Sequence, residues 1–95
     1  MLNRRKVVYR VHAVQRMFAR GISAEDVGQV LATGEIIEDY PDDKPYPSRL
    51  LLGWSGKRPL HLVVAYNAEE NEEILITVYE PDPSQWDEEF RRRKK

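Results

Sequence analysis

The chain has 95 residues, with 15 Lys or Arg and 16 Asp or Glu, so its net charge at pH 7 is −1. This length predicts a single domain over residues 1–95, and the near-neutral charge argues against a general nucleic-acid binder. The chain has no cysteine and only two histidines, which excludes disulfides and thiolate metal sites and leaves too few imidazoles for a metal centre. We therefore expect no metal and no cofactor.

The amino-terminal residues are basic but lack the long apolar run of a signal peptide, and no stretch reaches the ~18 apolar residues of a membrane span. We expect a cytoplasmic protein with no membrane partner. Charges are segregated: residues 1–20 hold six basic side chains and no acid, whereas residues 67–90 hold nine acids and no base. Basic segments that converge in the fold would bind an anion, and the alternative is ordinary ion pairing across solvated faces.

Residues 12–20 have the spacing of an amphipathic helix. Its apolar arc, which we expect to be buried, consists of Ala13, Val14, Met17 and Phe18. Three further side chains, His12, Arg16 and Arg20, follow one another at i, i+4 and i+8 along the edge of that arc. Gly21 is typical of the left-handed residue that ends a helix.

Ser23 and Asp26 form a capping-box pattern and predict the start of a second helix. We expect this helix to cover residues 25–33 and to end at Gly34. Residues 35–40 (EIIEDY) have strand character. The segment PDDKPYPS that follows has three prolines in eight residues, so we expect an exposed, irregular loop.

From Arg49 onward the apolar residues alternate with a period of two, which is typical of strands. We expect two strands joined by the turn Ser55-Gly56-Lys57-Arg58, and a third strand over residues 74–79 after the acidic turn AEENE. Prolines stop this third strand, and Ser84 begins a short C-terminal helix. The basic residues 91–95 are typical of a frayed terminus.

The register of the strands follows from matching their apolar faces, because a slip of one residue turns an apolar face outward. The pairs that satisfy all three strands are Trp54 with Leu60 and Tyr66 with Ile74. This register places Gly53 and Tyr79 on either side of His61, on an open face where His61→Ala should leave the fold intact. The predicted fold is α+β, with two N-terminal helices on one face of a three- to four-stranded antiparallel sheet and a short C-terminal helix.

Four segments resemble a family of small bacterial proteins catalogued as a domain of unknown function: HAVQRMFARGIS, GEIIEDY, GWSGKRPLHLVVA and TVYEPD. They are spread over nearly the whole chain. Members of that family resemble toxins of toxin–antitoxin pairs, and the order of helices before sheet is similar to the RelE and MqsR fold. The resemblance implies an endoribonuclease toxin that acts on RNA and pairs with an antitoxin containing a small zinc-finger domain.

A metal-independent ribonuclease needs a base for the 2′-hydroxyl, an acid for the leaving oxygen and cations around the phosphorane. We predict that His61 and Tyr79 are the catalytic residues, because an imidazole titrates near neutral pH and a phenol can donate a proton. The predicted RNA-binding side chains are His12, Arg16, Arg20, Lys57 and Arg58.

Each role has a structural alternative. His12 could bond the backbone at the start of its helix, and His61 with Tyr79 could be a cross-strand pair without chemistry. Arg16 could hold its helix to Glu38 or Asp39, in which case Arg16→Ala should lower stability more than activity. The alternative function is a non-catalytic module that binds a protein through a sheet edge and its charged surface. The net charge favours the module, and the histidine–tyrosine pair favours the ribonuclease; the oligomeric state does not follow from the sequence.

Overall fold

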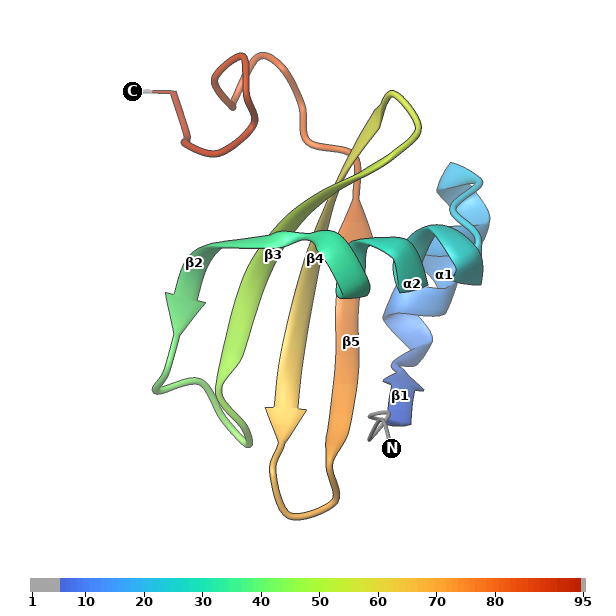
Figure 1. Ribbon diagram of the computed structural model, residues 1–95, viewed down its shortest axis with the longest axis vertical. Coiled ribbons are helices and arrows are strands. Elements are labelled where there is room, and N and C mark those ends of the chain that lie inside the picture. Colours follow the sequence, from blue (N-terminus) through green and yellow to red (C-terminus); the bar gives the residue numbers. More distant parts are fainter. Residues whose placement is uncertain (1–5, 95) are drawn as a thin grey trace.

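The computed structural model describes residues 6–94, which form a five-stranded sheet and two helices (Figure 1). The elements are β1 (Lys6–Tyr9), α1 (Val11–Arg20), α2 (Ala24–Thr33), β2 (Glu35–Tyr40), β3 (Ser48–Ser55), β4 (Arg58–Asn67) and β5 (Glu72–Tyr79). The strands lie in the order β1-β5-β4-β3-β2. Among residues 6–94, no helix is both long and apolar enough to cross a membrane.

The sheet is mixed, so the prediction of a three- to four-stranded antiparallel sheet is wrong, although the class is α+β. β1 pairs with β5 in parallel, with Val8 opposite Ile74, and the three other neighbouring pairs are antiparallel. β1 has only four residues, too few for a periodic pattern to identify it as a strand. Its partner β5 is also far away in the sequence, and no local pattern indicates that the two strands pair.

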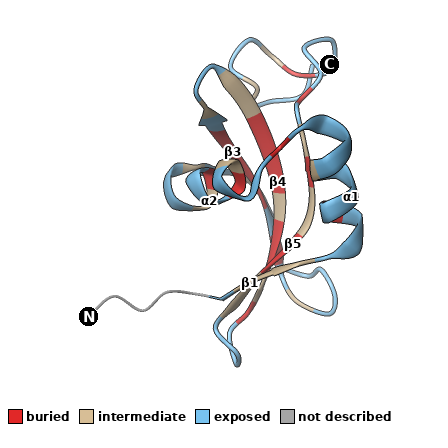
Figure 2. Cartoon of the chain, turned by 90° about the vertical axis from the view of Figure 1, so that its right-hand side faces the viewer, coloured by how far each residue is buried: buried red, intermediate tan, exposed pale blue. Residues whose placement is uncertain are grey.

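The prediction that both helices lie on one face of the sheet is wrong. α2 crosses in front of the strands and packs mainly on β3, whereas α1 packs on β5 (Figure 1). Figure 2 shows α2 and α1 on opposite sides of the strands. The difference arises because α1 begins directly after the edge strand β1 and therefore stays beside β5.

Both predicted helix boundaries between α1 and α2 are confirmed. Gly21 has φ 63° and its N–H bonds the carbonyls of the last turn of α1, a conformation that costs glycine no steric strain. At the start of α2, the Ser23 hydroxyl accepts a bond of 3.0 Å from the Asp26 N–H, and the Asp26 carboxylate accepts one of 2.8 Å from the Ser23 N–H. This is the capping box, and it fixes the turn between the helices.

The apolar arc predicted for α1 is buried only in part. Ala13 is fully buried and Met17 is half-buried, whereas Val14 is 46% and Phe18 90% exposed. Because α1 lies at the edge of the sheet, only the narrow side that meets β5 is covered. A stripe of apolar surface therefore remains exposed on this helix.

The hairpin of β3 and β4 is confirmed, but its predicted register is wrong by one residue. Ser55 pairs with Arg58 across a two-residue turn, and His61 therefore lies opposite Leu52 instead of Gly53. Gly53 consequently faces α2, where a Cβ built on it would lie 2.7 Å from a methyl group of Val30. The absence of a side chain at Gly53 makes room for the helix, and it does not open a space beside His61.

The pairing of β4 with β5 is confirmed at one end and wrong at the other. His61 lies opposite Tyr79 as predicted, but a bulge between Val63 and Val64 shifts the remaining pairs. Tyr66 therefore lies opposite Glu73 instead of Ile74. A bulge inserts one residue into a strand, and an apolar pattern alone does not locate it.

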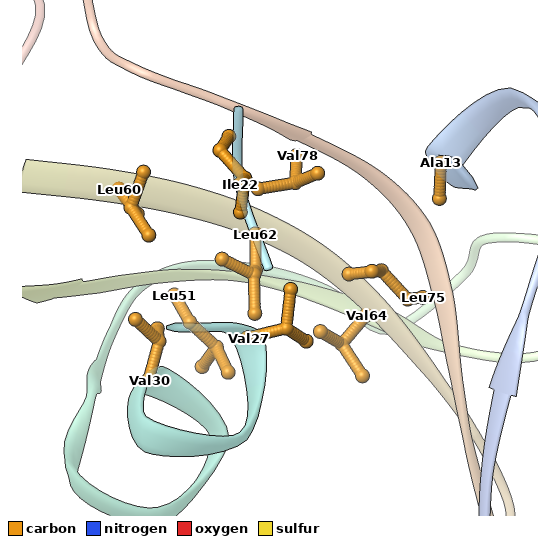
Figure 3. Close-up of a cluster of buried hydrophobic side chains, with 10 residues drawn as sticks. All are labelled: Ala13, Ile22, Val27, Val30, Leu51, Leu60, Leu62, Val64, Leu75 and Val78. Carbon is orange, nitrogen blue, oxygen red and sulfur yellow. The ribbon is translucent and has the colours of Figure 1, made fainter. Parts of the chain in front are cut away.

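The main core lies between α2 and the sheet face that α2 covers, and it extends to the contact of α1 with β5 (Figure 3). Its buried residues are Ala13, Ile22, Val27, Val30, Leu51, Leu60, Leu62, Val64, Leu75 and Val78. The opposite face of the sheet is also covered at one end. There the C-terminal segment, residues 81–94, runs from the end of β5 back toward β2 (Figure 1).

The short helix predicted after Ser84 does not form, because this segment is organised by turns. Asp82 accepts bonds from the backbone N–H groups of Ser84, Gln85 and Trp86, and Asp87 accepts others further on. Such local bonds satisfy the backbone without a helix. Of the residues predicted to be a frayed basic tail, Arg91 is held to β2 by an ion pair with Glu35 at 2.8 Å, and Lys95 lies outside the described residues.

Candidate anion-binding site

His61 and Tyr79 are neighbours across β4 and β5, on the sheet face opposite α2. Their ring centres are 5.3 Å apart, and His61 Nδ1 lies 3.3 Å from the Tyr79 hydroxyl oxygen. His61 Nε2 lies 2.8 Å from the carbonyl oxygen of Phe90. A carbonyl can only accept, so Nε2 carries the hydrogen and Nδ1 accepts from the Tyr79 hydroxyl. The pair is therefore a directed chain of hydrogen bonds from tyrosine through histidine to the backbone.

The open face expected around His61 is closed. His61 is fully buried, and Trp86 of the C-terminal segment packs edge-on against its ring with centres 4.4 Å apart. Burial lowers the pKa of the His61 imidazole, against the opposing effect of its bond to Phe90. The imidazole is therefore neutral and does not reach a ligand at the surface.

Tyr79 is the member of this pair that does reach a pocket. Burial raises the pKa of its phenol, so the hydroxyl stays protonated at neutral pH. The pocket has a volume of about 300 Å³ and lies between α1, the end of β5 and the C-terminal segment. Its lining residues are Arg16, Arg20, Thr77, Tyr79, Glu80, Asp82, Gln85, Trp86 and Arg93. We call it the arginine pocket, because three of these side chains are guanidinium groups.

The two carboxylates in the arginine pocket are already engaged. Glu80 pairs with Arg58 outside the pocket, and Asp82 accepts a bond of 2.8 Å from the Ser84 N–H, which lowers the pKa of its carboxyl. Within residues 6–94, the guanidinium groups of Arg16 and Arg20 form neither an ion pair nor a hydrogen bond. The pocket thus combines unpaired cations with a protonated phenol, which suits a bound anion.

The clamp considered for Arg16 is wrong. Glu38 lies 3.8 Å from Arg93, and Asp39 lies 3.8 Å from Arg49. Glu38 and Asp39, the two acids considered as partners, therefore lie near other arginines, and Arg16 is on α1, which packs on β5 instead of β2.

The predicted site residues separate into two groups. Arg16, Arg20 and Tyr79 come together in the arginine pocket, with His61 directly behind Tyr79. Lys57 is exposed at the tip of the hairpin and His12 is exposed on α1, and neither lines this pocket.

Arg58 lies outside the pocket and has a structural role. Its guanidinium donates to the carbonyls of Arg20 and Gly21, the latter at 2.9 Å, and also pairs with Glu80. A cation at the C-terminus of a helix satisfies carbonyls that have no partner within the helix. Arg58 thus joins the end of α1 to the sheet.

The residues that the sequence did not identify come mainly from the C-terminal segment: Asp82, Gln85, Trp86 and Arg93. Alternating strand patterns and helical spacing carry no information about an irregular segment. In the part of the chain that the structure describes, no three His, Cys, Asp or Glu side chains are grouped to hold a metal ion.

Residues 9–80 match the domain of unknown function DUF4258. This chain belongs to the DUF4258 family. The matched DUF4258 region contains both helices, β2 to β5 and, among the pocket residues, Arg16, Arg20 and Tyr79, and it ends before the C-terminal segment. No curated protein and no solved structure matches the chain.

Proposed function

We propose that this DUF4258 protein is an endoribonuclease that holds an RNA phosphodiester in the arginine pocket and cleaves it without a metal ion. One observation carries the proposal: the guanidinium groups of Arg16 and Arg20, which have no partner among the described residues, share a pocket with Tyr79. A guanidinium group can donate two parallel hydrogen bonds to a phosphate, and its positive charge stabilises the negative charge that develops around a pentacoordinate phosphorus. We further propose that the protein is the toxin of a toxin–antitoxin pair.

In the proposed reaction the ribose 2′-hydroxyl attacks the adjacent phosphorus. Tyr79 Oη takes the 2′-hydroxyl proton while it passes its own proton to His61 Nδ1, 3.3 Å away. The bond from His61 Nε2 to the Phe90 carbonyl then stabilises the imidazolium. The 5′-oxygen leaves and takes a proton from water, giving a 2′,3′-cyclic phosphate and a 5′-hydroxyl, and His61 then returns its proton through Tyr79 to the hydroxide formed. His61 acts here through Tyr79 and does not touch the RNA.

A protein-binding role is the second candidate, and the surface of α1 favours it. Among residues 6–94, three of the five exposed large apolar side chains lie on this helix: Val11 is 74%, Val14 46% and Phe18 90% exposed. Their spacing aligns them along one side of α1, apart from the arginine pocket. Contiguous apolar surface on a small protein often marks a contact with a partner, and an antitoxin is the partner that we propose.

The test measures growth arrest on expression in bacteria and cleavage of a defined RNA by purified protein in EDTA. Tyr79→Phe and the pair Arg16→Ala with Arg20→Ala should each slow cleavage by about 10² or more and relieve growth arrest. Arg49→Ala is the matched control, because this exposed arginine lies on β3, outside the pocket. Wild-type protein that neither arrests growth nor cleaves RNA would leave only the binding role.

A further inference from the structure

The C-terminal segment is folded on itself so that Arg93 lies beside Trp86. The two residues form an isolated β-bridge. Bonds of 2.8 Å from the Asp87 N–H to the Arg92 carbonyl and from the Lys94 N–H to the Gln85 carbonyl close the loop between them. The position of Arg93 therefore follows from the position of Trp86.

Trp86 is fastened to the body of the protein through His61. The indole is only 2% exposed and its ring meets the imidazole nearly at right angles, at 87°. The same imidazole donates to the carbonyl of Phe90, further along the segment. A single buried residue of β4 thus holds the C-terminal segment at two points, which is a more specific role than that of a core side chain.

Arg93 forms one wall of the arginine pocket. Its guanidinium lies 4.7 Å from the centre of the Trp86 ring, and its nearest carboxylate, Glu38, is 3.8 Å away with the Arg93 side chain 60% exposed. A contact of that length between an exposed guanidinium and a half-buried carboxylate is weak. Arg93 can therefore donate to an anion in the pocket while it remains stacked on Trp86.

We propose that Arg93 is a third phosphate-binding residue of the arginine pocket and that the contact of His61 with Trp86 is the latch that positions it. The C-terminal segment, which lies beyond the matched region of residues 9–80, would then complete the site. The inference rests on the proposed function only in taking an RNA phosphodiester as the ligand.

The experiment measures the affinity of the full chain for a fluorescent 2′-O-methyl RNA hexamer, which binds as RNA but has no 2′-hydroxyl to react. Arg93→Ala should weaken binding about tenfold, as expected for a lost charge-assisted contact. It should also reduce the slope of log affinity against log salt by about 0.7, the value for one phosphate contact on a single strand. Arg92→Ala is the matched control, since Arg92 is the neighbouring exposed arginine and does not line the pocket; its affinity and slope should stay at wild-type values.

The latch is tested with Trp86→Leu in the same assay. This variant should lose about as much affinity as Arg93→Ala, and the double variant should lose no more than either one, because both changes remove the same contact. Additive losses would overturn the latch, and equal effects of Arg93→Ala and Arg92→Ala would overturn the phosphate role. Binding that depends on Arg93 in a protein unable to cleave ordinary RNA would support the inference and contradict the proposed catalysis.

Discussion

Replacement of His61 by Ala should strongly destabilise the protein. The imidazole is fully buried between Tyr79 and Trp86 and accounts for two hydrogen bonds. Truncation of a large buried side chain costs about 2–5 kcal/mol, and a buried polar group left without a partner adds about 1–3 kcal/mol. The Tyr79 hydroxyl can turn toward the pocket, so we expect a total loss of about 3–4 kcal/mol. A domain of this size has only about 5–14 kcal/mol of unfolding free energy to lose.

Urea denaturation, followed by circular dichroism, measures this loss, with His12→Ala as the matched control. His12 is exposed on α1, so its replacement should change the unfolding free energy by no more than about 0.5 kcal/mol. A loss below about 1 kcal/mol for His61→Ala would refute the reasoning. It would mean that the sheet face around His61 is open and that the C-terminal segment does not cover it.

Three further predictions concern stability. Because burial lowers the pKa of His61, the unfolded chain takes up a proton before the folded protein does, so stability should fall as the pH drops below about 6.5. The urea midpoints at about pH 7.5 and 5.5 should differ less in His61→Gln than in the wild-type protein. An equal difference in both proteins would show that His61 is not the cause. Gly53→Ala places a Cβ 2.7 Å from Val30 and should cost about 1–3 kcal/mol, part of which the added change Val30→Ala should restore if the clash is the reason. Arg58→Ala removes the hydrogen bonds to the end of α1 and should lower the unfolding free energy by about 1–2 kcal/mol. A comparable loss for Lys57→Ala, at the neighbouring exposed residue, would argue against the capping role of Arg58.

The features that the sequence predicted correctly depend on residues close together in the chain. The Ser23–Asp26 capping box and the left-handed Gly21 are each complete within one helical turn. The hairpin around Gly56 is likewise specified by its turn and by the two alternating strands beside it. Such signals act before any tertiary contact exists, and a sequence pattern reports them directly.

The errors in the sheet arose where a single residue changes the geometry. A two-residue turn at Gly56 sets Leu52 opposite His61. A bulge between Val63 and Val64 shifts by one residue the β5 partner of every β4 residue from Val64 onward. The apolar pattern did not decide these points, because Leu50, Leu51 and Leu52 are consecutive apolar residues that satisfy either face. The face on which Gly53 lies is explained by its close contact with Val30 of α2, and only the tertiary structure shows that contact.

Three residues of the arginine pocket, Arg16, Arg20 and Tyr79, were among the predicted site residues, but the sequence did not show what brings them together. Arg16 and Arg20 meet Tyr79 because α1 is anchored beside β5 by the parallel pairing of β1. That pairing depends on four residues with no distinctive pattern. Arg93 was missed altogether, since its place in the pocket depends on contacts of the irregular C-terminal segment with His61.

The binding of an RNA phosphate in the arginine pocket is tested most directly by ¹H–¹⁵N spectra of the arginine side chains during titration with the 2′-O-methyl RNA hexamer. We predict that the Nε–H signals of Arg16 and Arg20 shift together and saturate at the same RNA concentration, while the signal of Arg49 stays in place. Unchanged signals of Arg16 and Arg20 at a concentration of RNA that shifts Arg49 would contradict the proposed site.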